Sequence, residues 1–152
     1  MEPCDRPYTT RGKWIAAATL ALAFLILSSP YAYNLTNSLT QMLGLTIADS
    51  SGCPNLQGLA GHALIFTLVV RGLIQAMENK CERQYASKDK WIVSFIAGIL
   101  FMIVGSPYLY EAVDSITSEL GYSTIKWTGC PNVSGLLIHS LVYGLAARAL
   151  MR

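Results

Sequence analysis

The chain has 152 residues, of which 53% are hydrophobic and only 13% charged, and its formal net charge is +2 at pH 7. Soluble domains carry roughly twice that fraction of charged residues, about 25%. The composition therefore excludes an ordinary soluble domain and indicates a polytopic membrane protein, and so small a net charge predicts no nucleic-acid partner.

Four apolar stretches follow one another along the chain, at 14–29, 57–77, 91–105 and 133–151. The first and third are short for a hydrocarbon core that is about 30 Å thick. However, each opens on a tryptophan, Trp14 or Trp91, and tryptophan is enriched at the membrane–water interface. We predict a transmembrane helix in each of the four stretches.

The two halves of the sequence match each other at a constant offset of 77 residues without a gap. Two motifs recur at that offset: Ser-Pro-Tyr-x-Tyr, from Ser29 and again from Ser106, and Gly-Cys-Pro-Asn, from Gly52 and again from Gly129. Such self-similarity is typical of a duplicated unit. We therefore divide the chain into a tail (1–12), a first repeat unit (13–77), a basic loop (78–89) and a second repeat unit (90–152).

Each unit contains a break after its first apolar stretch. Pro30 and Pro107 cannot continue a helix, because proline lacks the backbone N–H donor. After Pro107, apolar residues recur at helical spacing among acidic ones, which predicts a short amphipathic helix at the membrane interface. Gly44 and Gly121 suit the ends of these short helices.

The fold class that results is an all-α polytopic membrane protein. Its four transmembrane helices form two tandem parallel helical hairpins, each with one short amphipathic interfacial helix. Since each unit crosses the membrane twice, the units share one orientation, and a pseudo-two-fold axis along the membrane normal should relate them.

The basic residues predict the orientation. Of eleven lysines and arginines, all but Lys126 lie in the tail, the middle loop, the C-terminus or the adjoining helix ends. The positive-inside rule then places both termini and the middle loop on the cytoplasmic side.

Cysteine and histidine are the candidate site residues. Cys53 and Cys130 occupy equivalent positions on the opposite face, each nine residues before His62 or His139. One interpretation is a disulfide between Cys53 and Cys130, if that face is oxidising. The other is that both cysteines serve as small apolar residues where the chain enters a helix tightly. The same four residues could supply a tetrahedral zinc site, but their spacing matches no familiar ligand pattern, so we predict no metal.

The histidines lie inside predicted membrane helices, where an ionisable residue points to function unless it serves packing. Gly58 with His62, and Gly135 with His139, share a helix face. We interpret these four as helix-packing residues, the glycines permitting close approach and each imidazole bonding to a neighbouring helix. Paired histidines in pseudo-symmetric helices leave a small transporter or channel as the alternative.

The unit Ser-Pro-Tyr-x-Tyr … Gly-Cys-Pro-Asn-x-x-Gly-Leu-x-x-His, at 29–62 and 106–139, resembles small membrane proteins of large icosahedral DNA viruses of algae and amoebae. The resemblance covers nearly the whole chain outside 1–12 and 78–89, and it transfers no catalytic residue. It implies a virion component, either a structural protein of the inner membrane or a minor capsid protein that joins bilayer to shell.

From these observations we expect a structural membrane protein of a viral particle that anchors or organises the inner membrane beneath the capsid. Its partners would be the lipid bilayer, copies of itself and capsid proteins. No phosphate loop, nucleophile elbow or pair of catalytic carboxylates occurs in the sequence, so we predict neither an enzyme nor a cofactor.

Overall fold

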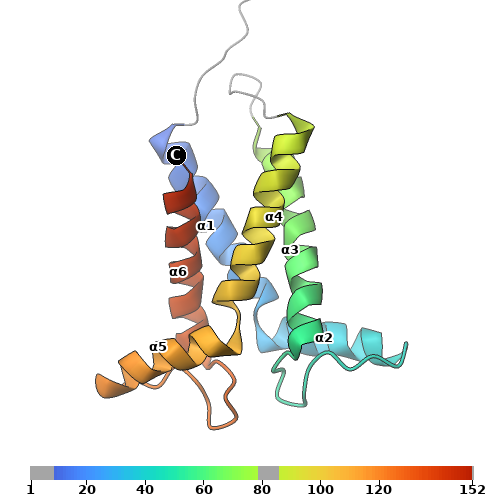
Figure 1. Cartoon of the computed structure of the whole chain (residues 1–152), viewed down its shortest axis with the longest axis vertical. Helices are drawn as coiled ribbons and strands as arrows, with labels where there is room; N and C mark the ends of the chain where they lie inside the picture. The colour runs from blue at the N-terminus through green and yellow to red at the C-terminus, as the bar shows by residue number, and fades with distance from the viewer. Residues whose placement is uncertain (1–8, 79–85, 152) are drawn as a thin grey trace, which may run out of the picture.

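The computed structural model describes residues 9–78 and 86–151, and this part of the chain is all-α. Its six helices are α1 (Thr10–Leu27), α2 (Pro30–Gln41), α3 (Leu56–Met77), α4 (Ser87–Val104), α5 (Pro107–Glu119) and α6 (Val133–Leu150). Each half of the chain thus contributes a long helix, a short helix and a second long helix, in the same order. The long helices form a bundle, and α2 and α5 lie across one end of it and point away to opposite sides (Figure 1).

Membrane-helix character is clear in three of the long helices. Helices α1, α3 and α6 are each long and apolar enough to cross a bilayer. Helix α4 meets the same criteria only together with α5, from which it is bent by 53°. Its first turn carries Lys88, Asp89 and Lys90, which make that end polar. The described chain therefore has three candidate spans, or four if the bent pair counts as one.

The Ser-Pro pairs set the break between long and short helices. Ser29 and Ser106 are N-caps whose hydroxyls accept hydrogen bonds from Ala32 N (3.2 Å) and Leu109 N (3.3 Å). The prolines that follow occupy the first helical turn, where no backbone donor is needed. The predicted interruptions at Pro30 and Pro107 are confirmed.

Glycines end both short helices, also as predicted. Gly44 and Gly121 have φ of +78° and +83°, a region that residues with a Cβ rarely adopt. The next residue in each case, Leu45 or Tyr122, donates its N–H back to a threonine carbonyl in the last turn. This pattern is the Schellman motif.

The main helix pairs form between the repeat units rather than within them. Helix α1 packs chiefly on α6, and α3 chiefly on α4 (Figure 1). Cation–π contacts join the same pairs at the basic end, with Arg148 over Trp14 (5.3 Å) and Arg71 over Trp91 (5.6 Å). The predicted hairpins therefore need a correction, because the two long helices of one unit make only minor contact with each other.

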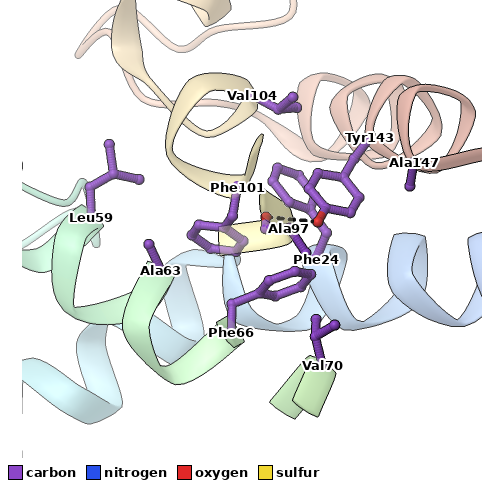
Figure 2. Close-up of a cluster of buried hydrophobic side chains, with 10 residues drawn as sticks. All are labelled: Phe24, Leu59, Ala63, Phe66, Val70, Ala97, Phe101, Val104, Tyr143 and Ala147. Carbon is purple, nitrogen blue, oxygen red and sulfur yellow. Dashed lines mark hydrogen bonds between the residues drawn. The ribbon is translucent and has the colours of Figure 1, made fainter. Parts of the chain in front are cut away.

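Four buried aromatic rings occupy the centre of the bundle, one from each long helix (Figure 2). Phe24 stacks on Tyr143 with ring centroids 4.9 Å apart, and Phe66 contacts Phe101 at the same distance. Two further contacts complete the cluster, with ring centroids 5.1 Å apart for Phe24 and Phe101 and 5.3 Å apart for Phe66 and Tyr143. Because each of these last two pairs joins positions 77 residues apart, this aromatic cluster lies where the two units meet.

Small residues allow the closest helix approach. A Cβ on Gly98 of α4 would overlap Thr67 Oγ1 of α3, and a Cβ on Gly144 of α6 would come within 3.0 Å of Ala21 Cβ on α1. Ala21 and Gly98 are equivalent positions, as are Thr67 and Gly144. Each main helix pair therefore combines one glycine with one larger residue. The position that holds the glycine in one pair holds the larger residue in the other pair.

Candidate functional site

The junction between the bundle and the short helices contains most of the residues that the sequence singled out. His62 of α3 donates from Nδ1 to the carbonyl of Leu27, at 2.7 Å, and His139 of α6 donates from Nδ1 to the carbonyl of Val104, at 2.8 Å. Leu27 and Val104 end α1 and α4, where the last carbonyls lack intrahelical partners. Each imidazole thus satisfies the C-terminus of the preceding long helix.

A tyrosine covers each imidazole. Tyr33 of α2 stacks on His62 with ring centroids 4.0 Å apart, and Tyr110 of α5 stacks on His139 at 3.8 Å. Both are the second tyrosine of Ser-Pro-Tyr-x-Tyr, and both are buried. The predicted hydrogen bond from each histidine to another helix is present, and its acceptor is a carbonyl at the C-terminus of that helix.

The two histidines differ at their second nitrogen. Since Nδ1 donates to a carbonyl, Nε2 of the neutral ring is an acceptor. In the first unit Thr36 Oγ1 lies 2.7 Å from His62 Nε2. In the second unit the equivalent residue is Val113, and His139 Nε2 is buried without a hydrogen-bond partner among the described residues.

Cys53 and Cys130 are joined in a disulfide, with their Cα atoms 5.6 Å apart. That separation lies within the usual range for a disulfide. The bond ties the loop before α3 to the loop before α6, across the two units. It lies beside a small cavity of about 40 Å³, which is room for about one water molecule.

The structure does not bring the four candidate zinc ligands together. Among the described residues, the one cluster of ligand-type atoms consists of Asp49, Cys53 and Cys130, without either histidine. Asp49 Oδ1 is already an acceptor for the backbone N–H groups of Ser51 and Cys53. The arrangement is that of a loop turn closed by a disulfide.

The asparagine of Gly-Cys-Pro-Asn caps the helix that follows it. Asn55 Oδ1 accepts from Gly58 N, and Asn132 Oδ1 accepts from Gly135 N, both at 2.8 Å. The same amides donate to carbonyls of the preceding loop, Asn55 to Thr46 and Asn132 to Ser123, both at 2.7 Å. Each asparagine therefore fixes both the start of a long helix and the path of the loop that enters it.

Gly58 and Gly135 have a role different from the predicted one. A Cβ on Gly58 would overlap the carbonyl oxygen of Ile47, and one on Gly135 would overlap that of Thr124. Both carbonyls belong to the loop before the helix rather than to a neighbouring helix. The glycines therefore permit close approach of loop backbone, whereas Gly98 and Gly144 are the glycines at the helix–helix contacts.

A side chain on each short helix secures the same loop. Asn37 Oδ1 accepts from the N–H groups of Ile47 (2.8 Å) and Ala48 (3.2 Å). Asp114, at the equivalent position of α5, accepts from the N–H of Thr124 and the hydroxyl of Ser123. The Thr124 N–H chiefly, with further bonds from Ser123 and Thr124, holds the pKa of Asp114 below its ordinary value.

A second and larger cavity lies at the opposite, basic end of the bundle. Its volume is about 400 Å³, and all four long helices contribute to its walls. Leu20, Ala97 and Tyr143 line it toward the aromatic cluster, and Lys13 and Glu78 line it toward the helix ends. Neither histidine borders this central cavity.

Neither a protein-family model nor a curated protein nor a solved structure matches this chain.

The sequence points to Tyr33 and Tyr110 only as members of the repeated Ser-Pro-Tyr-x-Tyr motif, and it does not indicate that they cover the histidines. It does not point to Asn37 or to the aromatic cluster. Identity between the halves was the available signal for some of them, since Phe24 recurs as Phe101 and Tyr33 as Tyr110.

Proposed function

We propose that this protein is a structural membrane protein that organises a bilayer, and that it serves in the internal membrane of an icosahedral virion. The observation that carries the first part is the arrangement of α2 and α5, which extend sideways from one end of an apolar bundle (Figure 1).

The short helices expose apolar side chains at helical spacing. On α2 and just after it, these residues are Tyr31, Leu35, Leu39 and Met42. On α5 the residues equivalent to Tyr31 and Leu39 are Tyr108 and Ile116, and both are exposed as well. An apolar stripe of this kind on a short helix is suited to the boundary between headgroups and acyl chains. Two such helices at one end would occupy area in one leaflet only and would favour membrane curvature.

The bundle itself offers lipid a largely apolar surface. Large apolar residues that face outward on the long helices are exposed, among them Leu22, Leu64, Ile99 and Leu141. In a bilayer these side chains would contact acyl chains or other copies of the protein. Such a molecule acts through the membrane and through lateral contacts, which suits an array beneath a capsid.

Vesicle shape tests the membrane-organising role. We expect purified protein, reconstituted into liposomes, to produce smaller or tubular vesicles in electron cryomicroscopy. Replacing Leu35 and Leu39 by Gln should abolish the effect, because it removes the centre of the α2 stripe. The matched control replaces exposed polar residues of α2, Asn34 and Ser38, by Gln. Vesicles indistinguishable from protein-free ones would refute the proposal.

The resemblance of the repeated motifs to viral membrane proteins supports the virion location. Its test is the composition of purified particles, in which the protein should remain with capsid proteins after mild detergent treatment. Its presence in host membranes alone would contradict the proposal.

A small transporter is the second candidate, and the central cavity is the observation that favours it. The histidines that suggested transport bond helix termini and do not border the cavity. Liposome flux assays that compare the wild type with a His62→Ala, His139→Ala variant decide the matter. Absence of flux in both removes this candidate.

A further inference from the structure

We infer that the central cavity is a binding site for one anionic phospholipid, with an acyl chain between the helix pairs and the headgroup at the basic end. This inference is independent of the curvature role proposed above, because it concerns the inside of the bundle rather than the short helices.

The cavity has the size and chemistry of a ligand site. Its volume of about 400 Å³ falls within the range typical of such sites, about 300–1,000 Å³. On α4 it extends from Lys90 to Leu100, which corresponds to about 15 Å of helix. The walls between are apolar and include Ala16, Val93 and Leu150. An apolar space of this length inside a membrane-type bundle matches an acyl chain.

The charged groups at the mouth identify the headgroup. Lys13, Glu78 and Lys90 line that end of the cavity. Lys90 Nζ lies 2.6 Å from Glu78 Oε2, and both side chains are over nine-tenths buried, so this pair is neutral as a whole. Among the described lining residues, Lys13 then leaves the mouth with one positive charge, which complements a headgroup with a net negative charge. Basic sites between membrane helices are a known mode of binding anionic headgroups.

Glu78 provides a buried hydrogen-bond acceptor at the mouth of the cavity. Glu78 Oε1 is inaccessible to solvent and has no hydrogen-bond partner among the described residues. An unsatisfied buried acceptor is costly, so a donor is expected there when the site is filled. An ammonium group would add a second positive charge at a mouth where Lys13 is already unbalanced, whereas a hydroxyl donates to Glu78 without adding charge. A headgroup with an anionic phosphate and a free hydroxyl, such as phosphatidylglycerol, satisfies Lys13 and Glu78 together.

Native mass spectrometry of the full chain, released from micelles that contain equal phosphatidylglycerol and phosphatidylcholine with identical acyl chains, tests the inference. We expect one retained phosphatidylglycerol per chain, favoured at least tenfold. Ala16→Phe should remove it by filling the cavity, whereas Ala18→Phe, on the exposed side of the same helix, should not. Equal retention of the two lipids, or equal retention by both variants, would overturn the inference.

The headgroup contact has its own test, which does not depend on how Ala16→Phe folds. Lys13→Gln should lower the preference for phosphatidylglycerol over phosphatidylcholine, because only the first lipid has a net negative charge for Lys13 to balance. We expect a change of about tenfold, the factor that corresponds to one charge-assisted interaction. Lys88→Gln removes the same charge from an exposed position that does not line the cavity and should leave the preference unchanged. An unchanged preference in Lys13→Gln, or the same loss in Lys88→Gln, would refute the placement of the headgroup.

Discussion

In each main helix pair a glycine on one helix faces a larger residue on the other, and a sharp prediction for Gly98 follows. In the α3–α4 pair Gly98 faces Thr67, and in the α1–α6 pair the equivalent residues are Ala21 and Gly144. Gly98→Ala should destabilise the protein, because the new Cβ would overlap Thr67 Oγ1. Adding Thr67→Ala should recover most of the stability, because the overlap with Oγ1 disappears. The nearest remaining neighbours of the new Cβ are the carbonyl oxygen of Ala63 at 3.2 Å and Cβ of residue 67 at 3.5 Å.

The magnitude follows from two opposing effects. An added methyl group in a tightly packed contact costs about 1–3 kcal/mol. Alanine in place of glycine inside a helix contributes up to about 1 kcal/mol in the other direction. Gly72→Ala isolates the second effect, because Gly72 has open space around its Cβ position and its equivalent in the second unit is already Ala149. Gly98→Ala should therefore be less stable than Gly72→Ala by about 1–3 kcal/mol.

The assay is equilibrium unfolding in mixed micelles, followed by circular dichroism. It compares the wild type with Gly98→Ala, Thr67→Ala, the double variant and Gly72→Ala. The coupling between the two substitutions should recover most of the loss. Equal stability of Gly98→Ala and Gly72→Ala would refute the close packing of α4 on α3. A double variant as unstable as Gly98→Ala alone would show that Thr67 is not the group that Gly98 accommodates.

Three further predictions concern the end of the bundle where α2 and α5 lie. Replacing Cys53 and Cys130 by Ser should lower the free energy of unfolding by up to about 4.5 kcal/mol, because the bond closes a loop with a sequence separation of 77; equal stability with and without reductant in the wild type would contradict this. Val113→Thr should raise the free energy of unfolding by about 0.6–1 kcal/mol, because the new hydroxyl gives His139 Nε2 a hydrogen-bond donor. A lower stability would contradict a hydrogen bond between that hydroxyl and His139. Because folding lowers the pKa of Asp114, this carboxylate stabilises the folded state above the unfolded-state pKa of about 3.9. The stabilisation is lost as pH falls through the lowered pKa. Asp114→Asn should remove that part of the acid dependence, and an unchanged pH profile would refute the role of this carboxylate.

Local features of the fold could be predicted from short segments of sequence, because their causes are local. A proline without an N–H interrupts a helix wherever it occurs, so Pro30 and Pro107 marked the breaks. A glycine after an amphipathic run suits a left-handed residue, so Gly44 and Gly121 marked the helix ends. The all-α, membrane-type character followed from the apolar stretches alone.

The roles of the candidate site residues were harder to predict, because they depend on partners that are distant in sequence. The sequence predicts a hydrogen bond from His62 to a neighbouring helix, but nothing near His62 in sequence indicates the carbonyl of Leu27, which is 35 residues away. Gly58 was assigned to helix packing because small residues serve that purpose in membrane helices. Only the path of the loop through Ile47 shows what the glycine accommodates.

Proline chemistry, apolar runs and repeated motifs are properties of the chain. They suffice to predict which segments are helical, where the helices break and that the two halves of the chain are similar. Tertiary structure alone decided that α1 pairs with α6 and α3 with α4. The four long helices are alike in composition, so their apolar faces do not specify partners. Steric fit does, through Gly98 against Thr67, Gly144 against Ala21 and the four aromatic rings between them.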